Sequence, residues 1–370
     1  MNFDLSDEQK MLKEQADGLL QEFSSPDRLR ELIDAKKDWD EQLWGKLAEM
    51  GFLGTVIPEA YDGLGLSDLD LGVISEALGR ANTAVPFFSS IVCAATAICQ
   101  AGSETQKSNW LSPLASGDVV ACFAYCEGKS GWRPSVNSVV FKGGKLNGTK
   151  TPVADAGISS IAIVTCRLDD QERLALVDLS QSGVSKTRLE SFDELRAHYQ
   201  LDFQDAEAEL LEFSGPQIID TLFDKVAVQL AFECIGGAEA CISMARDYAL
   251  GRMIFNRPLA GYQAVKHRLA DALHKVEFAR SNAYYAGWAS MGAADQLAAA
   301  AGSARLLANE AFQFAARENL QLHGGIGYTF EANCHFYYRR ERLNALILGP
   351  DQYWADRILN NIQVLAEDVA

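Results

Sequence analysis

Two widely separated segments carry side chains that could hold a phosphate-containing ligand. In the first, Arg252–Gln263, the Arg252 guanidinium offers a planar fork of donors that suits a pyrophosphate. Phe255 offers a ring face, and Gln263 offers an amide at the start of the next expected helix, where the helix dipole favours an anion. The same segment would also serve as an ordinary turn between two helices, with Arg252 in solvent.

The second segment, Gln321–Gly327, has glycines at Gly324 and Gly325 directly after a long, alanine-rich stretch. Because glycine has no side chain, the backbone there can approach a ligand closely. Glycine in this place is equally typical of a cap that only ends a helix. Each segment alone is weak evidence, so the prediction of a site depends on the two occurring together.

Composition and charge argue against several other functions. The 370 residues carry a formal charge of −17, and such an acidic surface repels the phosphates of nucleic acid. The five histidines show no metal-ligand spacing, and the eight cysteines form no Cys-x-x-Cys pair. We therefore expect no metal, and reduced thiols in a cytoplasmic protein. No apolar run approaches the roughly 20 residues of a membrane span, and the acidic start is unlike a secretory signal.

The elements that would position the two segments fall into three zones. Apolar residues recur at three and four positions up to residue 115, which indicates helices. Short apolar runs follow up to residue 212, with hairpin signals at Lys142–Lys145 and Asn147–Gly148. Beyond residue 213 the helical period returns, and long helices are expected at Ile218–Leu250, Gln263–Gly292 and Asp295–Leu322.

These zones predict an α+β protein with helical ends. We expect an N-terminal helical domain at 1–115, a middle antiparallel β domain at 116–214 and a C-terminal helical bundle at 215–370. The helix–sheet–helix order is distinctive before any motif is considered.

Taken together and in this order, the two segments resemble the FAD-holding surface of the acyl-CoA dehydrogenase family. Members of that family have a helical domain, a β domain and a four-helix bundle. The resemblance runs along nearly the whole chain, with Gly51–Gly65, Leu146–Lys150 and Phe223–Lys225 in family order. The resemblance implies that the ADP half of FAD is held by Arg252, Phe255, Gln263, Gln321, Gly324 and Gly325.

The resemblance also implies partners and a reaction. The family removes two hydrogens from the α and β carbons of an acyl-CoA thioester, and an electron-transfer flavoprotein accepts the electrons. The ADP-holding surface is largely presented to the FAD of a neighbouring subunit, so we expect a dimer or tetramer with a homologous dehydrogenase subunit.

The sequence departs from the family at the catalytic base. The family reaction needs a carboxylate that takes the α-proton while hydride passes to flavin N5. The resemblance places this carboxylate at Leu348, before Gly349, or alternatively at Val226 after Phe223–Lys225. Neither side chain can accept a proton, so both usual base positions are apolar.

The segments that contact the flavin ring in the family are altered as well. The strand that normally reads Tyr-x-Val-Thr-Glu-Pro-Gly appears here as Phe123–Lys129, with Cys126 in place of the threonine. A thiol is a poor hydrogen-bond donor. The later Trp-x-Thr motif appears as Pro152, Val153 and Ala154. The ring contacts are therefore lost while the ADP-side motifs remain.

Three explanations fit this combination. The chain could be the non-catalytic subunit of a hetero-oligomeric acyl-CoA dehydrogenase, for which a sterol side chain would be a fitting substrate by analogy. It could instead be a self-sufficient dehydrogenase whose base has moved to Glu233, on the same helix face as Val226. The alternative role for Glu233, as an interhelical or interface salt-bridge partner, is the favoured one. Thirdly, the scaffold could serve a flavin oxidase or monooxygenase.

Overall fold

The computed structural model describes residues 5–133 and 137–367. The chain divides into two compact units. The bundle unit comprises Met1–Pro26, Asp68–Thr83 and Ala227–Ala370, and the sheet unit comprises Asp27–Ser67 and Ala84–Val226. The predicted boundaries at 1–115, 116–214 and 215–370 follow composition and stay a prediction.

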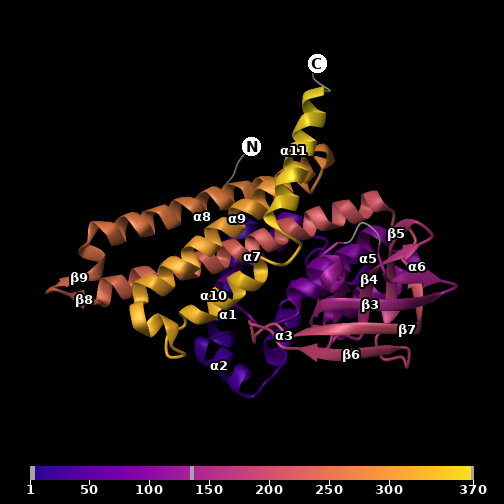
Figure 1. The fold of residues 1–370 in the computed structure, drawn as a ribbon, viewed down its shortest axis with the longest axis horizontal. Coiled ribbons are helices and arrows are strands. Elements are labelled where there is room, and N and C mark those ends of the chain that lie inside the picture. Colours follow the sequence, from indigo (N-terminus) through magenta and orange to yellow (C-terminus); the bar gives the residue numbers. More distant parts are fainter. Residues whose placement is uncertain (1–4, 134–136, 368–370) are drawn as a thin grey trace. The chain divides into compact units, whose positions relative to one another are not determined.

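The bundle unit consists of helices that follow the predicted period (Figure 1). The three long helices predicted from the sequence are confirmed, with ends within a few residues of those expected. The helices are α1 Asp7–Phe23, α4 Asp68–Arg80, α7 Pro216–Gly251 (whose first turns belong to the sheet unit), α8 Gln263–Ala289, α9 Ala294–His323, α10 Cys334–Asn344 and α11 Asp351–Glu367.

Glycines allow α4 and α7 to cross at very short range. A Cβ atom added at Gly79 of α4 would lie 2.0 Å from the carbonyl oxygen of Glu233. A Cβ atom added at Gly236 of α7 would lie 1.9 Å from the carbonyl oxygen of Glu76. Only glycine fits at these points, because any side chain would force the helices apart.

A network of charges around the buried Glu76 fixes the same crossing. Arg80 donates to Glu76 at 3.0 Å and to Glu239 at 2.8 Å, and Arg280 of α8 donates to the same carboxylates at 3.2 and 3.1 Å. Arg80 also pairs with Asp17 of α1 at 2.6 Å. These ion pairs link four helices of the bundle unit, α1, α4, α7 and α8, to one another.

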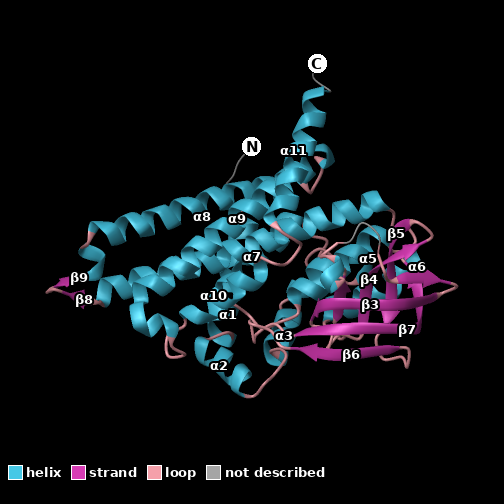
Figure 2. Ribbon diagram, in the orientation of Figure 1, coloured by secondary structure: helices cyan, strands magenta, loops and turns pink. Residues whose placement is uncertain are grey.

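The sheet unit combines strands with helices. Strands β1 to β7 form one sheet in the order β1-β4-β2-β3-β7-β5, with β6 beside β7, and the β4–β5 pairing closes the path (Figure 2). The strands are β1 Ala121–Ala124, β2 Val140–Lys142, β3 Lys145–Ala154, β4 Ile161–Leu168, β5 Gln171–Asp178, β6 Val184–Leu189 and β7 His198–Leu210. The helices are α2 Pro26–Asp34, α3 Glu41–Glu49, α5 Thr96–Ala101 and α6 Glu104–Ser116, together with the eight-residue π-helix η3 Phe88–Ala95. Short 3-10 turns lie at η1 Phe52–Gly54, η2 Glu59–Tyr61 and η4 Gly128–Ser130.

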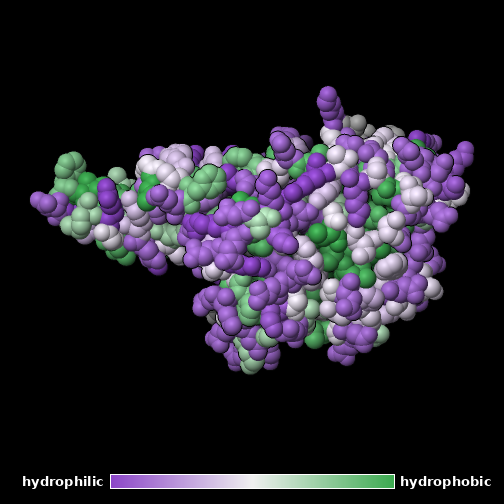
Figure 3. Space-filling view, turned by 90° about the horizontal axis from the view of Figure 1, so that it is seen from below, coloured by the Kyte–Doolittle hydropathy of each residue, from purple (hydrophilic) through white to green (hydrophobic). Residues whose placement is uncertain are grey.

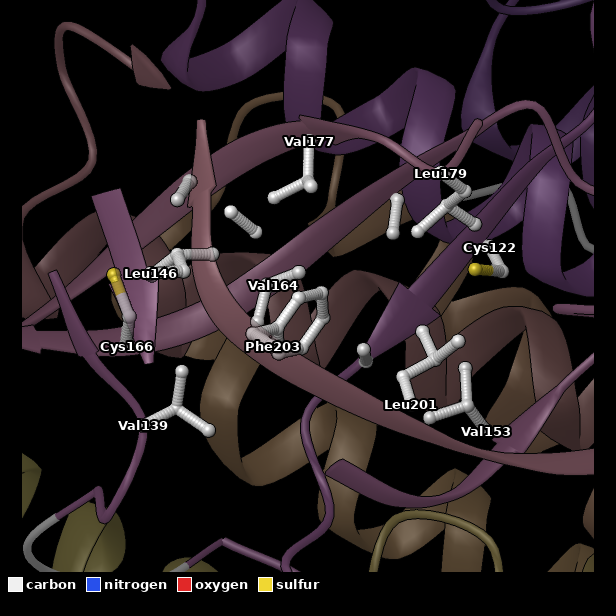
Figure 4. Packing of buried hydrophobic residues seen from close by; sticks show 14 of the residues in the cluster. Cys122, Val139, Leu146, Val153, Val164, Cys166, Val177, Leu179, Leu201 and Phe203 are labelled. Carbon is white, nitrogen blue, oxygen red and sulfur yellow. The ribbon is translucent and has the colours of Figure 1, made fainter. Parts of the chain in front are cut away.

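The predicted fold class is therefore confirmed: helical segments flank a middle β region. The sheet differs from the prediction in one respect, because β1–β4 and β2–β4 pair in parallel while its other pairings are antiparallel. Its core is a cluster of alternating inward residues such as Val164, Val177 and Phe203 (Figure 4). Burial of this cluster stabilises the sheet.

The two hairpin signals had different outcomes. The Lys142–Lys145 turn is confirmed, with Gly143 and Gly144 at φ +58° and +76° between β2 and β3. The Asn147–Gly148 turn was wrong, since both residues lie inside β3. Gly148, at φ +131°, sits at a register shift against β7, where a Cβ atom would lie 2.9 Å from Val139 Cα. Asn-Gly here forms a bulge rather than a turn.

Helix α7 is long and apolar enough to cross a membrane by length and composition alone. However, 78% of its most apolar 18-residue window is buried inside the molecule, as in the core helix of a globular protein. The cysteines, all within the described residues, are free thiols, and most are buried. Within 5–133 and 137–367, no group of three or more His, Cys, Asp or Glu residues is arranged to hold a metal ion.

Candidate functional site

The first predicted segment forms the end of the bundle unit. After α7, a short hairpin of β8 Met253–Ile254 and β9 Arg257–Pro258 leads through η5 Leu259–Gly261 into α8. Phe255 and Asn256 occupy the hairpin turn at φ +49° and +60°, and the Phe255 side chain is 91% exposed. Figure 3 shows hydrophobic side chains gathered at this end of the bundle. An exposed aromatic ring on a tight turn is suited to contact a flat ligand.

The second segment lies at the same end of the bundle. Helix α9 ends at His323, and η6 Gly324–Tyr328 follows. The His323 ring stacks on Tyr248 of α7, with 4.2 Å between ring centroids, so the ends of α7 and α9 meet. Gly324 has φ +63°, and a Cβ atom at Gly324 or Gly325 would meet nothing within 4 Å. The backbone there is open to a ligand.

The side chains at this end fit an ADP group. Arg252, Gln263 and Gln321 are exposed. Within the described part of the chain, the Arg252 guanidinium has no hydrogen-bond or ion-pair partner. It is therefore available to a pyrophosphate, and the neighbouring Phe255 ring is available to a base. The assignment of these residues to FAD stays a prediction.

Leu348 lies in a rigid turn after α10. Leu348 and Gly349 have φ +62° and +85°, and the Leu348 side chain is fully buried. The Leu348 carbonyl accepts a hydrogen bond from Trp354 Nε1 at 2.9 Å. Arg305 Nη2 of α9 donates to the carbonyls of Asn344 at 2.7 Å and Ile347 at 3.1 Å. The turn is thus held in place by its neighbours, with an apolar side chain where a base would stand. Val226 is also fully buried.

Glu233 is part of a buried interhelical contact in the bundle unit. Its Oε1 accepts hydrogen bonds from Arg340 Nη1 at 3.5 Å and Asn344 Nδ2 at 3.1 Å, both on α10. Arg340 also donates to the Thr83 carbonyl at 3.0 Å. This is the geometry expected of a salt-bridge partner, which was the alternative to a catalytic role. Glu233 as a base stays a prediction.

Cys126, which replaces the ring-contacting threonine, lies just after β1 in the sheet unit. Its Sγ contacts the Gly131 carbonyl at 3.6 Å, and burial raises the pKa of the thiol. The Cys126 carbonyl accepts a hydrogen bond from the Thr151 amide at 2.8 Å. The thiol and the carbonyl oxygen of Cys126 are therefore both engaged by backbone groups of this chain.

A buried ion pair beside Cys126 was missed by sequence reasoning. Lys150 Nζ, on β3, lies 2.7 Å from Glu127 Oε1 and donates to Asn137 Oδ1 at 2.9 Å and Thr165 Oγ1 at 2.8 Å. Glu127 also accepts hydrogen bonds from the Ser138 amide and hydroxyl at 2.8 and 2.7 Å. Burial alone would raise the pKa of Glu127, but the bonds from Lys150 and Ser138 bring it below its ordinary value. Lys150 stands at an inward position of an otherwise apolar strand face, and this was the signal in the sequence that could have indicated a buried ion pair.

An aromatic cluster beside the same segment was also missed. It consists of Phe123, Tyr125, Trp132 and Phe223. The Trp132 and Phe223 ring centroids lie 5.6 Å apart, and those of Tyr125 and Phe223 lie 5.7 Å apart. Phe223 lies on α7, far in sequence from the other three residues, so no local pattern could reveal the cluster.

Comparison with known families gives two matches. The model of the acyl-CoA dehydrogenase N-terminal domain matches residues 6–118. The model of the acyl-CoA dehydrogenase C-terminal domain matches residues 214–363. Together these cover most of the chain, including both predicted ligand segments.

Similar proteins and structures agree with the family models. Acyl-CoA dehydrogenase FadE27 of Mycobacterium tuberculosis is 27% identical over 360 residues, covering 94% of this chain and 95% of that protein. The ChsE4–ChsE5 complex from Mycobacterium tuberculosis has a chain with a TM-score of 0.90 and 26% identity, covering 98% of this chain and 99% of that one. A variant of the Tcur3481–Tcur3483 steroid ACAD has a TM-score of 0.90 and 29% identity, with the same coverage.

Proposed function

Because the chain belongs to the acyl-CoA dehydrogenase family of FAD-dependent oxidoreductases, we propose that it is the non-catalytic subunit of a hetero-oligomeric acyl-CoA dehydrogenase. The observation that carries the proposal is the fully buried Leu348, in a turn fixed by Trp354 and Arg305, where the family reaction needs a carboxylate. No proton transfer can begin at a leucine.

In this proposal the bundle end supplies cofactor contacts to a partner subunit. Arg252, Gln263 and Gln321 hold the pyrophosphate of the partner's FAD, Phe255 lies against its ADP part, and Gly324 and Gly325 let the backbone approach. The bound FAD supplies the hydride acceptor. The base and the ring contacts come from the partner.

The similar structures support a proposal for the partner and the substrate. Both the ChsE4–ChsE5 and the Tcur3481–Tcur3483 assemblies are named for two different proteins, and the second is called a steroid ACAD. A homologous, catalytically competent dehydrogenase chain is therefore the proposed partner, and an acyl-CoA with a bulky side chain is the proposed substrate. We place the complex in the cytoplasm, with an electron-transfer flavoprotein as acceptor.

The test is the flavin content of the complex. The chain is co-expressed with a homologous dehydrogenase from the same genome, the complex is purified, and FAD released per complex is measured by absorbance. Arg252→Ala should lower FAD retention. The matched control is Arg246→Ala, an exposed arginine near the end of α7 that pairs with its neighbour Asp247, and it should leave FAD content unchanged. Equal FAD content in both variants would contradict the proposed role of the bundle end.

A relocated base at Glu233 is not favoured by the geometry. Its carboxylate is already engaged by Arg340 and Asn344. A flavin oxidase or monooxygenase reaction has no specific support among the described residues.

A further inference from the structure

We infer that this chain closes the ring end of its own cofactor site with its own side chains and holds no isoalloxazine ring. The inference deepens the proposed function and rests on the family assignment. The ADP-side residues fit their group, whereas the segment from Phe123 to Arg133 does not fit a flavin ring. Three features of the sheet unit account for the mismatch: an aromatic cluster, the contacts of Arg133 and the local hydrogen bonds.

The first feature is the aromatic cluster itself. Phe123 of β1 contacts Tyr125 and Phe223 at centroid distances of 5.3 and 5.7 Å. Trp132 meets Tyr125 at 6.3 Å and Phe223 at 5.6 Å, both edge-on. A flat three-ring system beside this strand end would need the space that these rings fill, and rings in edge contact leave no slot between them.

The second feature is the clamp formed by Arg133. Its guanidinium lies 4.6 Å from the Phe223 ring centroid, which adds a cation–π contact to the cluster. Arg133 also pairs with Glu172 of β5 at 2.8 Å and with Asp220 of α7 at 2.7 Å. Its side chain is only 14% exposed. These contacts anchor the backbone next to Trp132, because Arg133 is its chain neighbour.

The third feature is the use of the local hydrogen-bonding groups. A flavin ring is held by donors aimed at its carbonyl and ring nitrogen atoms. Here the Glu127 amide donates to the Gly131 carbonyl at 3.1 Å, and the Gly131 amide donates to Gly128 at 3.1 Å. The Cys126 thiol points to the same Gly131 carbonyl. In the loop Cys126–Gly131, which would supply the donors, these groups are used for hydrogen bonds within the loop.

The consequence is an unequal share of cofactor in the hetero-oligomer. Each pair of different chains should hold one FAD, with its ring in the partner and part of its ADP contacts from this chain. The aromatic cluster then acts as the permanent occupant of the second ring site.

Two measurements test the inference. In the purified wild-type hetero-oligomer, FAD released by denaturation is counted against protein, and one FAD per pair of chains is expected. Two FAD per pair would overturn the inference. This count needs no variant, so it stands even if an altered chain fails to fold.

The second measurement uses riboflavin, which has the ring without the ADP. Quenching of its fluorescence is titrated with the full chain. The double variant Trp132→Ala, Arg133→Ala should bind riboflavin roughly tenfold more tightly than the wild type, a difference of about 1.4 kcal/mol. Trp288→Ala, a partly exposed tryptophan of α8, is the control and should match the wild type. Equal affinity of the double variant and the wild type would overturn the inference.

The two hypotheses fail in different ways. An active complex that holds two FAD per pair of chains would contradict only the inference that the ring site of this chain is closed. A chain that excludes riboflavin but neither joins nor activates any homologous dehydrogenase sinks only the proposed function.

Discussion

Replacement of the buried Lys150 by methionine should destabilise the chain strongly. The Lys150 side chain has no exposed surface, and its Nζ serves Glu127, Asn137 and Thr165 at 2.7 to 2.9 Å. Methionine keeps most of the volume but removes the charge and the donors. The Glu127 carboxylate would then be buried without its cation.

The magnitude follows from the burial of the pair. Removing one partner of a buried ion pair costs about 3–5 kcal/mol, because the other charge is left uncompensated. Total stabilities are commonly about 5–15 kcal/mol, so the loss is a large fraction. Lys150→Met combined with Glu127→Gln should cost less than the sum of the single changes, since neither charge remains buried alone.

The assay is urea denaturation at neutral pH, followed by tryptophan fluorescence and circular dichroism. The matched control is Lys145→Met, an exposed lysine of the same strand, which should change the unfolding free energy by no more than about 0.5 kcal/mol. If Lys150→Met cost no more than Lys145→Met, Lys150 and Glu127 would not form a stabilising buried ion pair.

Other predictions concern pH, the base turn and a helix cap. The pKa of Glu127 is lowered in the folded chain, so as the pH falls the unfolded chain takes up this proton first. The free energy of unfolding should therefore fall as the pH drops below the ordinary value of 4.5. In Glu127→Gln the midpoint of urea unfolding should depend less on pH. Arg305→Met should lower the unfolding free energy by about 2–3 kcal/mol in urea, because two carbonyls lose a charged donor; no change would refute its capping role. Glu233→Gln should lower the free energy of unfolding in urea by about 3 kcal/mol, because Arg340 loses its charged partner. If the variant complex were instead fully stable but had lost turnover, Glu233 would be identified as the base. Ser103→Ala should cost about 1 kcal/mol in thermal unfolding, because it removes the capping box of α6; an unshifted midpoint would speak against it.

The long helices could be predicted because their signals are local. Residues 218–250 carry a helical period without interruption, and Gly324 marks the end of α9 with a φ that favours glycine. The turn at Lys142–Lys145 was predictable for the same reason, since Gly143 and Gly144 adopt positive φ. The Asn147–Gly148 error arose because the residues that suit a turn also suit a bulge, and only the partner strand decides between them.

The parts that sequence did not reveal depend on distant residues. The parallel pairing of β1 with β4 joins strands separated by a loop and a hairpin. Arg133 pairs with Glu172 of β5 and Asp220 of α7, which lie far from it in sequence. A salt-bridge role for Glu233 was foreseen as one of two alternatives, but Arg340 as its partner was not, because the two residues lie on α7 and α10.

The central claim is that this chain supports an acyl-CoA dehydrogenase without performing the chemistry itself. The most direct measurement is the visible spectrum during addition of acyl-CoA, recorded for the purified chain and for its complex with a homologous dehydrogenase. We expect the chain alone to be colourless and unresponsive, and the complex to be yellow and to bleach. A chain that is yellow alone and bleaches on adding acyl-CoA would contradict the central claim.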